Sequence, residues 1–188
     1  MKTLIVIAGA EGAGKSTIMS ALLPHTPRAG KIDAEDVGQV HPFSFDTPFL
    51  EMLWSNVTAV IGNYWAAGYT TVITGSFLDR DSHGSLQEFL DRLGQSPKLY
   101  VVHLVPSTAA RDHRRMSRPK PTSKEWRDAV DAGYRQNSKS LRDNARDFHY
   151  IAIDNSDQTV QETVAAIRAA IPAVYGDAGR RPKPQQGA

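Results

Sequence analysis

The amino-acid sequence predicts an α/β protein built around a parallel sheet with helices on both faces. Short apolar runs alternate with helix-like stretches along almost the whole chain, as in repeated strand–helix–strand units. A glycine-rich segment, residues 9–14, also joins the first apolar run directly to the first helix-like stretch. At 188 residues the chain is best explained by one domain. We expect this domain to span 1–171 and to be followed by a disordered tail at 172–188, rich in Gly, Pro, Gln and Arg.

The predicted strands are apolar runs bounded by turn residues. The runs at 3–8 and 99–105 are almost unbroken, which is typical of central strands in a parallel sheet. Shorter runs predict strands at 29–33, 70–74 and 149–153, so the sheet should contain five strands.

The longest predicted helix covers 48–67, where apolar residues recur at intervals of three and four and Gly68 supplies a C-cap. Another helix starts near Ser107, which offers an N-cap, and ends before the prolines at 119 and 121. The full set of predicted helices is 17–23, 48–67, 80–93, about 107–117, 123–141 and 157–170.

Residues 9–16 fit the phosphate-loop pattern G-x-x-x-x-G-K-[ST] without a mismatch, between a predicted strand and a helix N-terminus. In this setting successive backbone N–H groups and the helix dipole bind phosphate. Lys15 can reach the outer phosphates of a nucleoside triphosphate, and the Ser16 hydroxyl can hold Mg²⁺. The candidate ATP-binding residues here are Gly9, Glu11, Gly12, Ala13, Gly14, Lys15, Ser16 and Thr17, with Ser16 as the candidate metal ligand.

Composition excludes several other kinds of site. The chain has no cysteine, which excludes disulfides, thiolate catalysis and cysteine-based zinc sites. Its histidines are scattered without metal-ligand spacing, and a formal net charge of +2 does not require a nucleic-acid partner. The N-terminal apolar run is too short for a signal peptide, and no segment approaches the length of a membrane span. We therefore expect a cytoplasmic protein with no membrane partner.

Missing motifs select among the classes of phosphate-loop protein. The chain lacks the Asn/Thr-Lys-x-Asp element of a GTPase and the LSGGQ-like signature of a transporter ATPase. It is also short for a motor or a helicase. These exclusions leave a small kinase that uses ATP and Mg²⁺.

Acidic residues end the second predicted strand. In an open parallel sheet, ligands bind beyond the carboxyl ends of the strands, so Asp33 should face the same crevice as the phosphate loop. A carboxylate there can accept the proton of a hydroxyl that attacks the γ-phosphorus. Asp36 could bind substrate or magnesium-bound water. The alternatives are that Asp33 is a helix N-cap and that Glu35 and Asp36 are simply solvated.

The segment 111–120 carries five basic residues and one acidic residue, and it follows the fourth predicted strand. Arginines on a flexible segment can stabilise the charge that develops on the γ-phosphate and can exclude water. We therefore predict a lid at about 112–122, with Arg114 and Arg118 four residues apart on one helical face. A solvated basic helix and an RNA-contacting face are the alternatives.

Two further positions concern nucleotide and metal binding. Asn155, in the loop after the fifth predicted strand, could contact the adenine edge or serve as a turn residue or cap. The third predicted strand ends at residues 72–76 without the acidic residue of a Walker B motif. Mg²⁺ would then rest on Ser16, the phosphates and water, with help from Asp33 through a water molecule.

These residues together resemble the small-molecule and nucleoside-monophosphate-type P-loop kinases over 1–171. The likeness to chloramphenicol phosphotransferases, zeta toxins and polynucleotide kinases, often labelled AAA-type domains, rests on five elements. They are the phosphate loop, the Ile32-Asp33 strand end, the Trp54-Ser55-Asn56-Val57 run, and the runs 67–73 and 76–80. Shikimate and gluconate kinases are similar in scale and layout.

The resemblance implies a P-loop NTPase three-layer sandwich with strand order 2-3-1-4-5 and a small lid. In adenylate kinases, an arginine near the start of the lid stacks on adenine and another, four residues later, contacts phosphate. By this likeness Arg114 would contact ATP and Arg118 would be catalytic, although Arg111 and Arg115 share the same spacing.

The favoured function is therefore transfer of the γ-phosphate of Mg-ATP to a hydroxyl of a small molecule, with Asp33, Lys15 and Arg118 as catalytic candidates. A nucleic-acid 5′-end kinase, suggested by the lid charge and by residues 180–183, and a non-catalytic nucleotide-binding partner protein are the alternatives. The acceptor should bind between the end of the second strand, the 41–60 region and the lid, where aromatic residues suit a planar ring but could equally be core. The candidate acceptor-binding residues are Asp36, His41, Phe45, Trp54 and Ser76.

Overall fold

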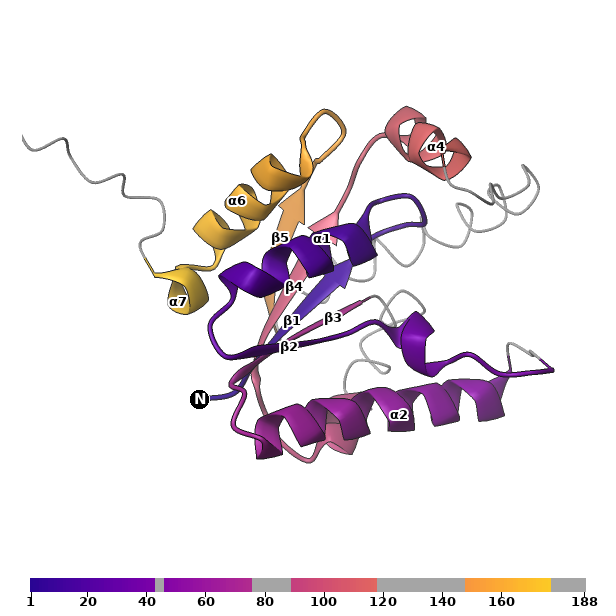
Figure 1. The fold of residues 1–188 in the computed structure, drawn as a ribbon, viewed down its shortest axis with the longest axis vertical. Coiled ribbons are helices and arrows are strands. Elements are labelled where there is room, and N and C mark those ends of the chain that lie inside the picture. The colour runs from indigo at the N-terminus through magenta and orange to yellow at the C-terminus, as the bar shows by residue number, and fades with distance from the viewer. Residues whose placement is uncertain (43–45, 76–88, 118–147, 177–188) are drawn as a thin grey trace, which may run out of the picture.

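Five parallel strands form a central sheet in the order β2-β3-β1-β4-β5, which confirms the predicted fold class and strand order (Figure 1). This arrangement comes from a computed structural model that describes residues 1–42, 46–75, 89–117 and 148–176. Each strand lies within about one residue of its predicted position. The strands are β1 (Thr3–Ala8), β2 (Ala29–Ile32), β3 (Thr71–Gly75), β4 (Lys98–Leu104) and β5 (His149–Ile153).

Helices cover both faces of the sheet and make three layers (Figure 1). Helix α1 (Lys15–Leu22) and helix α6 (Val160–Ala170) lie on one face, and α2 (Thr47–Ala66) lies on the other. The shorter helices are η1 (Leu23–His25), η2 (Ala34–Val37), α4 (Thr108–Met116) and α7 (Pro172–Tyr175).

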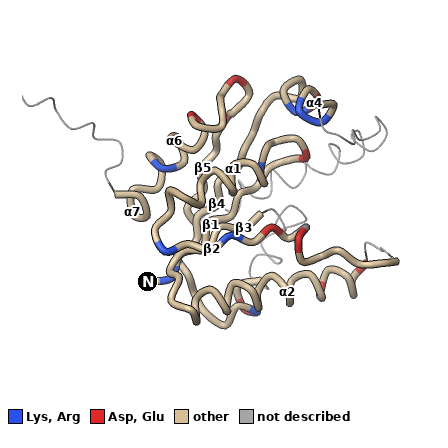
Figure 2. The backbone as a smooth tube through the Cα atoms, viewed as in Figure 1, with Lys and Arg blue, Asp and Glu red and all other residues tan. Residues whose placement is uncertain are grey.

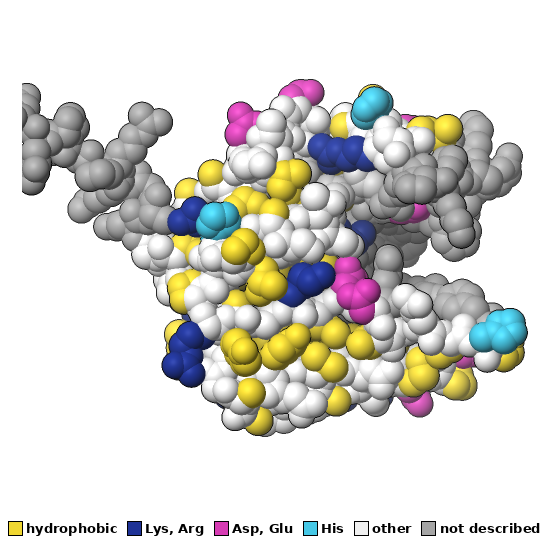
Figure 3. Space-filling model, in the orientation of Figure 1, with side chains coloured by type: hydrophobic (Ala, Val, Ile, Leu, Met, Phe, Trp, Pro, Cys, Tyr) yellow, Lys and Arg dark blue, Asp and Glu magenta, His cyan; other side chains and the backbone are white. Residues whose placement is uncertain are grey.

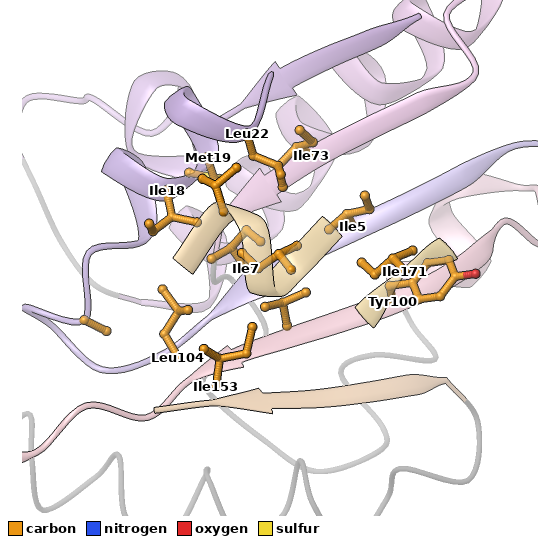
Figure 4. Packing of buried hydrophobic residues seen from close by; sticks show 14 residues of the cluster. Ile5, Ile7, Ile18, Met19, Leu22, Ile73, Tyr100, Leu104, Ile153 and Ile171 are labelled. Atoms are coloured by element: carbon orange, nitrogen blue, oxygen red, sulfur yellow. The ribbon is translucent and has the colours of Figure 1, made fainter. Parts of the chain in front are cut away.

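The central strand β1 is buried on both faces, as its unbroken apolar sequence predicts. Leu4 and Val6 join the core under α2. Ile5 and Ile7 join the core under α1 and α6, which Figure 4 shows from close by. Because side chains alternate between the two faces of a strand, each side chain of the sheet packs against the helices of one face only.

Helix ends differ from the prediction for local reasons. α1 begins at Lys15 instead of 17, directly after the phosphate loop. α6 begins at Val160 instead of 157, because Thr159 and Glu162 form a reciprocal capping box. The expected disordered tail is wrong for its first residues, which form α7. The Tyr175 hydroxyl lies 3.0 Å from that of Thr26, and burial raises the pKa of Tyr175.

Some expected elements lie outside the described residues. Of the predicted helix at 80–93, only 89–93 are described, and they are helical. The predicted helix at 123–141 and the tail from 177 onward are not among the described residues. Where the chain is described, no helix combines the length and the apolar character that crossing a membrane requires.

The edge strand β2 is held against α2 by a close contact between Gly30 and Tyr64. A Cβ on Gly30 would lie 2.6 to 2.7 Å from atoms of the Tyr64 ring. This ring cannot easily move away, because its hydroxyl donates a hydrogen bond to the Lys31 carbonyl at 3.1 Å and it forms a T-shaped contact with the Tyr69 ring.

We therefore expect Gly30→Ala to lower the free energy of unfolding by about 2 kcal/mol, since overpacking of a filled site forces neighbours to move. Chemical denaturation measures this change. Gly62→Ala is the matched control, because nothing lies within 4 Å of a Cβ at this position of α2. It should stabilise the protein by about 0.5–1 kcal/mol through helix propensity. Equal effects of the two variants would contradict the steric explanation.

Candidate active site

The phosphate loop connects the centre of the sheet to a helix end. β1 ends at Ala8, and α1 begins at Lys15 with Gly14 as its N-cap at φ 94°. No side chain caps this helix. The first N–H groups of α1 therefore have no side-chain acceptor and can bind an anion instead.

Lys15 reaches back across the loop. Its Nζ donates hydrogen bonds to the carbonyl oxygens of Gly9 at 2.7 Å and Ala10 at 3.3 Å. The half-buried ammonium is thus held beside the loop, where it can exchange these acceptors for phosphate oxygens.

A cavity of about 430 Å³ adjoins the loop, α1 and the start of α6. It has the size of a small-ligand site and combines polar side chains with apolar ones such as Ile18 and Val160. Its position directly beside the phosphate loop suits the base and sugar of a nucleotide. The lining residues are Gly12, Ala13, Gly14, Thr17, Ile18, Arg114, Asn155, Gln158, Thr159, Val160 and Thr163.

Several lining residues were missed by the sequence analysis. Gln158, Thr159, Val160 and Thr163 belong to the loop and the first turn after β5. Because the helix was predicted to start at 157, residues 157–159 were not recognised as part of this loop. The Thr159 and Glu162 pair is a recognisable capping-box signal that would have placed the helix start correctly and kept 154–159 as a loop facing the site.

Asn155 and Arg114 join three chain segments at this cavity. The Ala13 carbonyl accepts from Asn155 Nδ2 at 3.1 Å and from Arg114 Nη1 at 3.3 Å. Arg114 Nη2 also donates to the Asn155 carbonyl at 2.6 Å. Asn155 is only 3% exposed, and within the described part of the chain its Oδ1 has no hydrogen-bond partner. The two sequence-predicted residues therefore lie together, next to the phosphate loop.

The loop around Asn155 is fixed by local hydrogen bonds. Ser156 donates to Asp154 Oδ1 from its hydroxyl at 2.5 Å and from its backbone N–H at 2.9 Å. These bonds hold the pKa of the Asp154 carboxyl below its ordinary value. The Ser156 hydroxyl also accepts from the Ser107 N–H at 2.8 Å, which ties this loop to the start of α4.

Helix α4 packs directly on the phosphate loop through Arg115, which the sequence analysis named only because it shares the spacing of the favoured arginines. This side chain is fully buried, and its Nε donates to the Glu11 carbonyl at 3.0 Å. Its Nη1 lies 3.2 Å from Asp112. A Cβ on Gly12 would lie 2.8 Å from the Arg111 carbonyl and 3.1 Å from Arg115 Cγ, so only glycine lets α4 approach this closely.

The basic segment is thus partly structural. Figure 2 shows the basic residues of α4 beside the loop that joins β1 to α1. Arg111 and Arg115 are buried, so the interpretation as a solvated basic helix is wrong for these two residues. The predicted lid at 112–122 begins within α4. Its residues from Arg118 onward lie outside the described part of the chain, so their role in a lid remains a prediction.

Asp33 stands at the carboxyl end of β2 and contacts the phosphate-loop helix. Its Oδ2 accepts a hydrogen bond from the Ser16 hydroxyl at 2.7 Å. Asp36 follows on η2, where its N–H donates to the Asp33 carbonyl at 3.0 Å and its side chain is exposed. Figure 3 shows acidic side chains on the surface where β2 ends. The structure therefore brings the predicted carboxylate to the predicted metal ligand.

The candidate acceptor-binding residues are less well gathered. His41 is exposed, and Trp54 is half-buried with the guanidinium of Arg92 5.5 Å from the centre of its ring. Phe45 and Ser76 lie outside the described residues. Among the described side chains of this group no contact joins one to another, so their grouping around an acceptor stays a prediction.

The donors near the loop fit Mg²⁺ better than a transition metal. Over the described ranges, no group of three or more His, Cys, Asp or Glu side chains could hold a metal ion. Ser16 and Asp33 offer hard oxygen atoms, which suit a magnesium ion that keeps several waters and binds phosphate oxygens.

Comparison with solved structures finds the same fold at low sequence identity. An unliganded sugar kinase from Janibacter sp. HTCC2649 superposes with a TM-score of 0.63 at 16% identity, over 93% of this chain and 98% of that one. Thymidylate kinase from Candida albicans gives 0.59 at 12% identity, over 92% of both chains. A gluconokinase from Sinorhizobium meliloti 1021 gives 0.58 at 16% identity, over 92% and 93%.

A scan against protein-family models finds no match, and a search of the curated proteins finds no significant one. At these low sequence identities, the structural likeness establishes the fold alone. It agrees with the resemblance read from the phosphate loop and with the observed strand order. The chain therefore has the P-loop NTPase fold in the form shared by small kinases.

Proposed function

We propose that this protein is an ATP-dependent phosphotransferase that moves the γ-phosphate of Mg-ATP to a hydroxyl group of a small molecule. The contact between Asp33 and the Ser16 hydroxyl carries the proposal, because it puts a carboxylate beside the helix end where terminal phosphates would bind. The fold shared with a sugar kinase and a gluconokinase supports phosphoryl transfer to a small acceptor.

Nucleotide binding is assigned to the loop and the adjoining cavity. The N–H groups from Gly9 to Thr17 would bind the phosphates, except that of Ala13, which donates to the Ala10 carbonyl at 3.0 Å. Lys15 would neutralise the outer phosphates. Arg114 and Asn155 would contact the base in the cavity. Ser16 would hold the metal ion, and Mg²⁺, when bound, neutralises charge on the β- and γ-phosphates.

Phosphoryl transfer is assigned to the end of β2. In this proposal Asp33 accepts the proton of the acceptor hydroxyl as its oxygen attacks the γ-phosphorus and the bond to ADP breaks. Arg118 is kept as a charge-neutralising candidate on sequence grounds. The acceptor would lie against Asp36, His41, Phe45, Trp54 and Ser76, within a domain of residues 1–171 that works in the cytoplasm, where Mg-ATP is supplied.

A two-part experiment tests the function. Calorimetry measures binding of Mg-ATP, and mass spectrometry follows a panel of sugars, nucleosides and other hydroxyl compounds for the gain of one phosphoryl group. We expect heat on ATP addition and ATP turnover that rises only with particular alcohols.

The other outcomes separate the alternatives. Phosphorylation of an oligonucleotide 5′ end, with salt-sensitive binding, would instead support a nucleic-acid end kinase. Tight ATP binding without any phosphorylated compound would support a nucleotide-binding partner protein. No heat with Mg-ATP would remove the basis of all of these proposals.

A further inference from the structure

Strand β3 lacks the acid that usually completes a magnesium site in phosphate-loop proteins. In these proteins Mg²⁺ is held by the serine or threonine of the loop and by an aspartate of the Walker B motif. Here β3 ends with Thr74 and Gly75, and neither side chain carries a charge. If Mg-ATP binds, the carboxylate that would hold the metal ion, here called the metal-side carboxylate, therefore has to come from another element.

The sheet register identifies the position that such an acid would occupy. Gly75 pairs with Ile7, and Ile7 and Ile73 both belong to the core under α1. Thr74 lies between Ile73 and Gly75 in the strand, so it faces the opposite layer. An acid on β3 that faced Ser16 at the start of α1 would therefore stand at position 75.

The carboxylate of Asp33 already occupies the space in front of Gly75. A Cβ on Gly75 would lie 3.2 Å from Asp33 Oδ1, while Asp33 Oδ2 accepts a hydrogen bond from the Ser16 hydroxyl at 2.7 Å. One oxygen of this carboxylate thus lies over the end of β3, and the other holds the metal-binding serine. The absence of a side chain at 75 leaves room for this arrangement.

We propose that Asp33 supplies from β2 the metal-side carboxylate that β3 lacks, and that Gly75 is the residue that makes this possible. The Ser16 hydroxyl donates its hydrogen bond to Asp33, which leaves the lone pairs of its oxygen for Mg²⁺. The same carboxylate can accept hydrogen bonds from metal-bound water. This inference rests on the proposed function only in requiring that Mg-ATP bind.

Relocation of the carboxylate tests the inference. The affinity for ATP is measured by calorimetry with excess Mg²⁺ and again with EDTA, and the ratio of the two dissociation constants reports how far the metal strengthens binding. In Asp33→Ala this ratio should fall by about 10- to 100-fold, the usual loss when an outer-shell partner of a metal is removed. The metal-free affinity should be unchanged or tighter, because a negative charge near the phosphates is gone.

The double variant Asp33→Ala/Gly75→Asp should recover most of the ratio. The backbone of Gly75 is outside the left-handed region, and the nearest other obstacle is the Met19 side-chain end at 3.1 Å, so aspartate can be placed there. Glu51→Ala is the matched control, because it removes an exposed acid of α2, on the other face of the sheet from Ser16 and α1, and should leave the ratio unchanged. Binding of Mn²⁺-ATP, followed by electron paramagnetic resonance, should give the same order of variants.

Two results would overturn the inference: an unchanged ratio in Asp33→Ala, or no recovery in the double variant while its metal-free ATP affinity is intact. The screen of hydroxyl compounds described above tests the proposed function separately from this inference. A ratio that follows the carboxylate, with no alcohol phosphorylated by the unaltered protein, would keep the metal assignment and reject the kinase. If alcohols are phosphorylated but the ratio is unchanged in Asp33→Ala, the kinase assignment stands and the metal assignment is rejected.

Discussion

Replacing Lys15 with methionine should lower the rate of phosphoryl transfer by about a thousandfold, since removal of one preorganised charge from a transition state typically costs 10²- to 10³-fold or more. Nζ of Lys15 is held over the loop by the Gly9 and Ala10 carbonyls, within reach of bound phosphates. Methionine keeps the length of the side chain but has neither the charge nor the hydrogen bonds. Initial rates with an accepted alcohol measure the effect.

Lys98→Met is the matched control for this variant. Lys98 begins β4 and lies 5.3 Å from the centre of the Tyr100 ring, at the opposite end of the sheet from the loop. Its loss should leave the transfer rate within about twofold, because a partly solvated charge at the far end of the sheet is screened from the site. Equal rates for Lys15→Met and the unaltered protein would reject the assignment of phosphate binding to this loop.

The second large effect is expected from Arg115→Met. This guanidinium is fully buried and donates to the Glu11 carbonyl at 3.0 Å, so its removal leaves a loop acceptor without that donor. We expect the free energy of unfolding to fall by about 3 kcal/mol, in the upper range for a single substitution that leaves a buried polar group unpaired. The affinity for ATP should also fall, because α4 no longer fixes the loop.

His113→Met is the control on the same helix, two residues earlier, where the side chain is exposed. It should change neither the denaturation midpoint nor the ATP affinity by a measurable amount. If Arg115→Met unfolds at the same denaturant concentration as His113→Met, the buried arginine does not anchor the loop. Arg115→Lys, which keeps the charge but cannot reproduce the Nε–H bond, should lie between the two.

The sequence is informative where local rules decide the outcome. The five apolar runs predict the strands within about one residue. The runs are most nearly continuous in the central strands, because these are buried on both faces of the sheet. The phosphate loop is equally local, since its eight residues specify both the turn and the helix end. Strand order came only from the family resemblance, because apolar runs do not say which strands are neighbours.

Non-local contacts are what the sequence could not supply. Arg111 and Arg115 share the spacing of Arg114 and Arg118, and nothing in the order of residues says which pair turns toward the loop. The structure buries the first pair and places Arg114 at the cavity. Likewise, nothing in the sequence indicates a role for Gly75. The role becomes visible only in the structure, where Asp33 from another strand lies in front of this glycine.

The hydrogen bonds that α4 and Asn155 make to the loop carbonyls also decide where the loop amides point. A trans peptide unit is planar, and its C=O and N–H are directed oppositely. Arg115 draws the Glu11 oxygen toward α4, and Arg114 with Asn155 draws the Ala13 oxygen toward the cavity wall. The N–H groups of Gly12 and Gly14 are thereby turned the other way before any anion arrives. Two arginines and an asparagine outside the loop thus set the polarity of its interior. The reorientation that a free glycine-rich chain would undergo on binding is already complete.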